Sequence, residues 1–116
     1  MAFEGSCHCG AVTFTVEGDP PGQAVRCNCS HCQRKGFLLA FYPASAVRLK
    51  SGEEALRTYR FNTHRLAHRF CETCGVQPFA EGSAPDGSAT RAVNLLCVPT
   101  LDLATLQIQD FDGAAV

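Results

Sequence analysis

Apolar and polar residues alternate along short segments of this chain, and a period of two predicts β-strands rather than helices. In the clearest segment Val12, Phe14 and Val16 alternate with polar residues, and a turn rich in glycine and proline follows over 18–22. The same pattern predicts further strands over 24–27, 37–42, 47–50, 56–61, 65–71, 76–80 and 92–98, with a hairpin turn at 62–63.

Helical signals are few. Residues 30–35 are expected to form one helical turn capped by Ser30, and residues 102–106 another capped by Asp102. The sequence therefore predicts a mostly β protein with little helix. The order of the elements leaves open a barrel, a sandwich or small stacked sheets.

Length and charge narrow the class of protein. A chain of 116 residues is long enough for one compact domain, so we expect residues 1–116 to form a single domain. Its core is modest, and a bound metal would add stability. The net charge is −1, with 10 basic and 11 acidic residues. This balance gives no basic surplus for nucleic acid.

The N-terminus and the apolar segments bear on where the protein is found. The first residues lack the charged and apolar regions of a signal peptide. Apolar stretches such as 37–41 and 93–98 are too short to cross a membrane. We therefore expect a cytoplasmic protein without a membrane partner.

Seven of the eight cysteines fall into three short clusters, which are Cys7 and Cys9; Cys27, Cys29 and Cys32; and Cys71 and Cys74. In a reducing cytoplasm clustered cysteines bind metal more often than they form disulfides. A disulfide framework is the alternative, since eight is an even number, but the C-x-C and C-x-x-C spacings favour zinc.

The first and last clusters each end in Cys-Gly, at Gly10 and Gly75. A loop around a metal needs positive φ and backbone N–H groups turned toward the sulfurs. Two such loops supply four thiolates from Cys7, Cys9, Cys71 and Cys74, and a four-cysteine zinc site is closed and structural. Its affinity for zinc would add to folding stability.

The middle cluster supplies only three thiolates, from Cys27, Cys29 and Cys32. Three protein ligands and one exchangeable position describe a catalytic zinc, and a thiolate-rich zinc suits the activation of another thiol. The fourth ligand is water, a substrate, a histidine or Cys97. If Cys97 or His31 closes the site, it is a second structural one. A lone cysteine in an apolar strand, as expected for Cys97, is more often a buried hydrophobe.

The remaining candidates are histidines and a basic pair. We expect none of the four histidines to be a ligand and expect His68 to line a pocket. Arg34 and Lys35 follow the middle cluster, where they either form a solvated turn or bind the carboxylate of an anionic thiol.

The order of motifs from Cys7 to Cys97 is familiar: Cys-x-Cys-Gly, Cys-x-Cys-x-x-Cys, His-Arg-Phe-Cys-x-x-Cys-Gly and Val-Asn-x-x-Cys. It resembles the glutathione-dependent formaldehyde-activating enzyme family, which includes centromere protein V. The segments 29–36, 59–63, 75–79, 83–87 and 111–113 also look like those of the family. The resemblance covers roughly the whole chain.

The resemblance implies a mostly β, Mss4-like fold of small stacked antiparallel sheets around zinc. It implies one closed zinc site matching Cys7, Cys9, Cys71 and Cys74. It also implies a second zinc, matching Cys27, Cys29 and Cys32, that handles the condensation of glutathione with formaldehyde to S-hydroxymethylglutathione. The chain departs from the family's usual pattern at 80–82, 95–96 and 98–101. If these positions shape the pocket, we expect an altered specificity for glutathione.

Together these features predict a cytoplasmic zinc enzyme of the carbon–sulfur lyase type that acts on glutathione or a similar small thiol. It would hold two zinc ions per chain, the second of them labile. The alternative is a zinc-stabilised binding module without catalysis, which would hold a single zinc tightly and bind a partner on its sheet.

Overall fold

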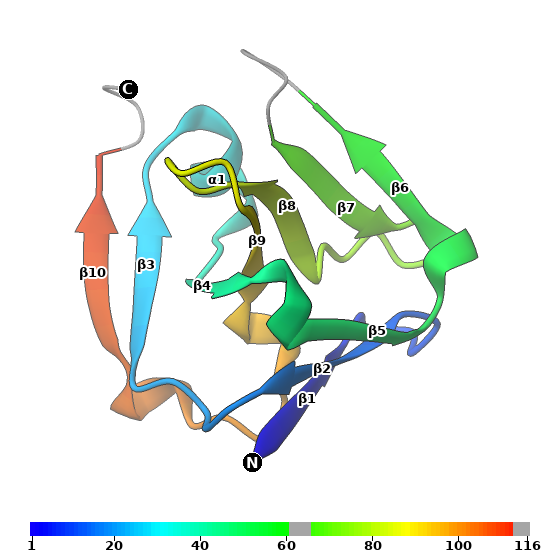
Figure 1. The fold of residues 1–116 in the computed structure, drawn as a ribbon, viewed down its shortest axis with the longest axis horizontal. Coiled ribbons are helices and arrows are strands. Elements are labelled where there is room, and N and C mark those ends of the chain that lie inside the picture. Colours follow the sequence, from blue (N-terminus) through cyan, green and yellow to red (C-terminus); the bar gives the residue numbers. More distant parts are fainter. Residues whose placement is uncertain (61–65, 113–116) are drawn as a thin grey trace.

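The computed structural model describes residues 1–60 and 66–112. These residues form ten strands, one short α-helix and four one-turn 3-10 helices (Figure 1). The strands are β1 Ala2–Ser6, β2 Thr13–Glu17, β3 Gln23–Cys27, β4 Leu39–Pro43, β5 Val47–Ser51, β6 Leu56–Tyr59, β7 Ala67–Cys71, β8 Phe79–Ser83, β9 Ala89–Asn94 and β10 Gln107–Phe111. The helices are η1 Ala44–Ala46, η2 Glu53–Ala55, η3 Leu95–Cys97 and η4 Leu103–Thr105, with α1 at Ser30–Lys35. The hairpin turn expected at 62–63 and His64 lie outside the described residues.

The strands form two sheets. The smaller has the order β1-β2-β5, and the larger has the order β10-β3-β4-β9-β8-β7-β6. The predicted fold class, mostly β with small sheets and little helix, is confirmed. One pairing departs from the antiparallel expectation, since β10 runs parallel to β3 and places Phe111 opposite Cys27.

The main core lies between the two sheets. Phe14 and Val16 on β2 pack with Val93 on β9 and Leu95 at the start of η3, and all four side chains are fully buried. The ring of Phe14 meets that of Phe79 edge-on at a centroid distance of 6.2 Å. The alternation seen in the sequence therefore marks the face of β2 that the larger sheet covers.

The larger sheet bends between β3 and β4, which pair only at Val25 and Leu39. In Figure 1, β3 and β10 stand on one side of the molecule and β6 and β7 on the other, with α1 near the upper ends between them. A cleft lies between these two parts of the sheet, lined by residues of β3, β4, β7, β8, β9 and β10. No helix in the described part of the chain is long and apolar enough to cross a membrane.

The structure differs from the prediction at the start of α1 and at the end of β9. The expected cap of α1 is wrong: Cys29, not Ser30, precedes the helix, and its Sγ accepts the Cys32 N–H. The strand expected over 92–98 ends at Asn94, because the Asn94 side chain accepts the Leu96 N–H and starts η3, which contains Cys97. The helical turn capped by Asp102 is confirmed.

The strand expected over 76–80 begins only at Phe79. The Cys71 N–H donates to the Val76 carbonyl at 2.9 Å and closes the cysteine loop, and Pro78 has no N–H to donate to a ladder. Residues 76–78 therefore belong to the loop rather than to β8.

Candidate metal centres and the adjoining cleft

The first candidate metal centre joins two loops that are far apart in sequence. Cys7 and Cys9 lie between β1 and β2, Cys71 ends β7, and Cys74 follows it. The four Sγ atoms lie within 4.8 Å of one another. Cys9 Sγ is 3.6 Å from Cys7 Sγ and 3.7 Å from Cys71 Sγ. Tetrahedral zinc with Zn–S bonds of about 2.3 Å places sulfurs about 3.8 Å apart, so this donor set fits zinc.

The two loops have the same backbone design. Cys7 N–H donates to the Val12 carbonyl at 3.0 Å, as Cys71 N–H does to Val76. Gly10 has φ of 83° and Gly75 has φ of 80°, which confirms the expected positive φ at the glycine of each Cys-Gly pair. A Cβ at either glycine would meet no atom within 4 Å, so the backbone conformation alone requires glycine there.

Backbone N–H groups favour the thiolate form of Cys71 and Cys74, whereas at Cys9 a backbone N–H is outweighed by burial and the neighbouring thiols, which raise its pKa to about 11. The N–H groups of Cys74 and Thr73 lower the pKa of Cys71. Burial raises the pKa of Cys74, but the N–H groups of Cys9 and Val76 outweigh it and hold this pKa at about 6. Thiolate is the form that binds metal, so the loop that carries Cys71 and Cys74 is prepared for a cation.

The second candidate centre lies where β3 meets α1. Cys27 ends β3, Cys29 caps the helix and Cys32 lies within it; their Sγ atoms are within 4.8 Å of one another. Cys29 N–H points to Cys27 Sγ at 3.5 Å, and Cys32 N–H to Cys29 Sγ at 3.3 Å. Among the described residues no further histidine, cysteine or carboxylate joins this group.

The three thiols differ in their electrostatic surroundings. Burial raises the pKa of Cys29, but the N–H groups of Cys32 and His31 lower it below its ordinary value. Burial, reinforced by the Cys29 thiol, raises the pKa of Cys32. A chelating set of sulfurs held by a strand end and one helical turn fits a metal with one position left over.

Cys97 belongs to neither group of sulfurs. Its side chain is buried in the main core, where Sγ lies 3.7 Å from the Gln77 carbonyl oxygen and 3.7 Å from Asn94 Nδ2. Burial raises its pKa to about 12, so the thiol keeps its proton. The structure thus places Cys97 as a buried core residue and not as a fourth ligand of the second centre.

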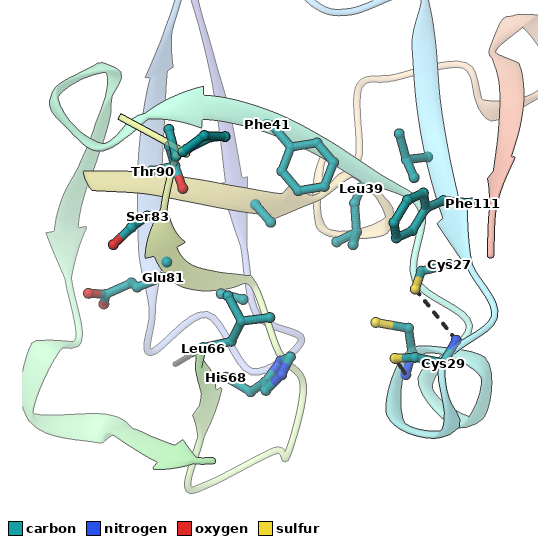
Figure 2. Close-up of a pocket in the computed structure, with 17 residues that line it drawn as sticks. Cys27, Cys29, Leu39, Phe41, Leu66, His68, Glu81, Ser83, Thr90 and Phe111 are labelled. Atoms are coloured by element: carbon teal, nitrogen blue, oxygen red, sulfur yellow. Dashed lines mark hydrogen bonds between the residues drawn. The ribbon is translucent and has the colours of Figure 1, made fainter. Parts of the chain in front are cut away.

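A cleft of about 550 Å³ opens beside the second centre on the concave face of the larger sheet. Its lining comes from β3, α1, β4, β7, β8, β9 and β10. Figure 2 shows Cys27 and Cys29 on one side, Glu81 and Ser83 on the opposite side, and Phe41 and Leu39 between them. None of the four cysteines of the first centre borders this cleft.

His68 lines the cleft, as expected. Its Nδ1 is 3.2 Å from Gln77 Nε2, and its ring packs at 4.0 Å against that of His31, which also stacks on Tyr59. Burial, with smaller effects from His31 and Lys35, lowers the pKa of His68 to about 4. At neutral pH its imidazole is uncharged.

Two sequence expectations about the pocket have clear outcomes. Arg34 and Lys35 do not line the cleft, and Arg34 Nη1 instead donates to the Ser30 carbonyl at 2.9 Å. Residues 80–82, where the chain departs from the family pattern, do line it. The apolar wall of Phe41, Leu66 and Phe111 was missed, because nothing in the local sequence shows that these residues face one space.

Comparison with known proteins gives consistent results. Residues 2–108 match the family described as glutathione-dependent formaldehyde-activating enzyme. A Halomonas elongata protein provisionally named a glutathione-dependent formaldehyde-activating enzyme is 53% identical over 82 residues, or 64% of this chain. The match covers 52% of that relative, so the chain spans about half its length. A crystal structure of a Rhodobacter sphaeroides protein superposes with a TM-score of 0.81 at 32% identity, over 94% of this chain and 100% of that one.

Proposed function

Because the chain belongs to the glutathione-dependent formaldehyde-activating enzyme family, we propose that it is a zinc enzyme of the carbon–sulfur lyase type. It would form and break the bond between a thiol sulfur and an aldehyde carbon. The reference reaction is the condensation of glutathione with formaldehyde to S-hydroxymethylglutathione. One observation carries the proposal: the three-cysteine group borders a large cleft, whereas the four-cysteine group does not.

The two centres have separate roles in this proposal. Cys7, Cys9, Cys71 and Cys74 would hold a structural zinc that joins the β1–β2 turn to the loop after β7. Cys27, Cys29 and Cys32 would hold the second zinc, and three protein ligands would leave one position for substrate. When bound, that ion supplies the positive charge that favours the thiolate form of an incoming thiol.

The side chains of the cleft hold the reactants together and limit access of water. In the addition, the thiol sulfur bonds to the carbonyl carbon and the proton of the S–H group ends on the carbonyl oxygen, with no change of oxidation state. His68 has no part in this proton transfer, because its Nδ1 faces Gln77 and its Nε2 is buried. Water at the mouth of the cleft exchanges the proton, and proximity of sulfur and carbonyl supplies the acceleration.

The test is the rate of hydroxymethyl-thiol formation from glutathione and formaldehyde in the presence of zinc-loaded protein. NMR exchange spectroscopy measures this rate. We expect acceleration over the spontaneous reaction, and its loss in Cys29→Ser with the fold retained. If the protein neither binds a thiol in calorimetry nor changes this rate, the proposed function is wrong. A single tightly held zinc per chain would then favour the non-catalytic binding module.

A further inference from the structure

We infer that the cleft binds the apolar group of an uncharged thiol, so that the preferred thiol is an aromatic or branched aliphatic one rather than anionic glutathione. The inference rests on the proposed function and narrows its substrate class. It is carried by the chemistry of the cleft wall, by the charges around the second centre and by the direction in which the cleft extends.

The wall of the cleft is mostly apolar. Apolar side chains of this wall come from four different strands and from the segment before β7. They include Val25, Leu39, Phe41, Leu66, Ala92 and Phe111. Phe41 is 61% exposed and Leu66 is 50% exposed. An apolar ligand would remove these surfaces from water, which is the main source of affinity in such a site.

The charges of the cleft do not favour an anion. Glutathione has more carboxylates than ammonium groups, and buried carboxylates need cationic or N–H partners. No lysine or arginine occurs among the described residues that line the cleft. Glu81 is the acidic residue of the wall, and it is already paired with Arg69 Nη1 at 2.6 Å. His68 is uncharged at neutral pH, so the described residues that line the cleft offer no free positive charge.

The other side of the second centre is equally unsuited to carboxylates. A second cavity of about 530 Å³ borders Cys27 and Cys32 there. Its only described cation, Arg26, is held by Asp110 at 2.8 Å, and Asp112 accepts from Asn28 Nδ2 at 3.0 Å. Acidic side chains therefore outnumber basic ones around this cavity.

The position of the sulfurs fixes the orientation of the ligand. Cys27 and Cys29 lie at one end, and Figure 2 shows Leu39, Phe41 and Leu66 between them and the polar far side of the cleft. A thiol whose sulfur lies at the cysteine end therefore extends its substituent along this apolar wall. A volume of about 550 Å³ leaves room for such a substituent together with a small aldehyde.

The inference is tested by calorimetry on zinc-loaded protein with 2-phenylethanethiol and glutathione as separate ligands, under a thiol-free reductant. We expect 2-phenylethanethiol to bind at least about tenfold more tightly. The thiol-free analogue 2-phenylethanol should bind weakly and compete with 2-phenylethanethiol, because it occupies the same apolar wall. Glutathione binding equally or more tightly would overturn the inference.

A matched pair of variants locates the binding surface. Leu66→Ala removes a half-exposed leucine of the cleft, and Leu96→Ala removes one that is 45% exposed and outside it. We expect the first to weaken 2-phenylethanethiol binding at least about threefold and the second to leave it unchanged. Equal effects of the two variants would overturn the inference, with circular dichroism as a check on folding.

The reaction rates separate this inference from the proposed function. Tight, Leu66-dependent binding of 2-phenylethanethiol without faster addition of any thiol to formaldehyde would support the cleft assignment and reject the enzyme. Faster addition with glutathione preferred over 2-phenylethanethiol would support the enzyme and reject the apolar preference.

Discussion

At the scale of single residues, the cysteines divide by environment as well as by spacing. Cys71 belongs to the first centre. It is fully buried, and its sulfur accepts hydrogen bonds from backbone N–H groups. Cys97 is equally internal, but its thiol keeps its proton and bonds to Gln77 and Asn94. Burial alone therefore does not identify a metal ligand; the presence of two or three further cysteine sulfurs within 4.8 Å does.

This contrast predicts different outcomes for two serine substitutions of buried cysteines. Cys71→Ser removes a ligand and should lower the free energy of unfolding by about 3 kcal/mol or more, with loss of one zinc per chain. Cys97→Ser keeps a hydroxyl near the same partners and should cost about 1 kcal/mol while both zinc ions remain. Urea denaturation and metal analysis by mass spectrometry measure both; loss of zinc from Cys97→Ser would contradict the assignment.

His68 makes stability depend on pH. Its pKa is about 4 in the folded protein and 6.5 ordinarily, because burial disfavours the charged ring. Above pH 6.5 both states are neutral at this residue; below it the unfolded chain takes up the proton first. The contribution of His68 to stability is therefore lost as the pH falls from 6.5 to about 4.

The variant His68→Gln removes this titration. The unfolding free energies of the two proteins should diverge with pH across that window, the wild type falling more steeply. Urea titrations of both proteins at a series of pH values give the difference between their unfolding free energies. Acid releases metal from both proteins alike, so this effect largely cancels in the difference. Parallel curves would show that His68 titrates normally in the folded state.

At the scale of elements, the two cysteine loops depend on a backbone conformation that glycine supplies. Gly75→Ala places a side chain at φ of 80°, and we expect it to lower the unfolding free energy by about 1 kcal/mol. Gly22→Ala is the matched control, since Gly22 also has open space around it but is not among the positive-φ glycines. Thermal unfolding compares them; an equal, small effect would mean that the loop tolerates other conformations.

The sequence allowed the elements with clear local signals to be predicted. The alternation around Phe14 marked β2, and the Cys-Gly pairs marked the two loops with positive φ. β10 was missed because all five of its residues are exposed, so burial imposes no alternation on them. It is held instead by parallel pairing with β3 and by the Arg26–Asp110 ion pair, which is a non-local contact.

The same reasoning explains what could be predicted of the site. The sulfurs of each centre come from one or two short segments, so spacing was enough to group them. The cleft has walls from several strands across a bent sheet, and Phe41, Leu66 and Phe111 meet there only after folding. Long-range pairing, not local pattern, decides which side chains face one another.

At the scale of the whole molecule, the four-thiol centre joins parts of both sheets. Cys7 and Cys9 adjoin the smaller sheet, and Cys71 ends a strand of the larger one. Val12, Leu56 and Phe79 pack around these cysteines in a buried cluster. Removal of metal there should loosen the contact between the sheets. The second centre involves only β3 of the larger sheet and α1, so removal of its metal should leave that contact intact.

Chelation should therefore occur in two stages. A mild chelator is expected to remove zinc from Cys27, Cys29 and Cys32 with little change in the melting temperature. A strong chelator should also remove the zinc bound by the four cysteines of the first centre and lower the melting temperature by several degrees, roughly 4 °C or more for a domain of this size. Colorimetric zinc release recorded beside thermal unfolding follows both stages. Release of both ions together with unfolding would contradict separate roles.

The most direct test of the central claim is a crystal structure of zinc-loaded protein soaked with a thiol, with anomalous data at the zinc edge. The account predicts one zinc bound by Cys7, Cys9, Cys71 and Cys74, and a second bound by Cys27, Cys29 and Cys32. The soaked thiol sulfur should lie about 2.3 Å from the second ion. A protein side chain in that fourth position, or a thiol bound elsewhere, would contradict the account.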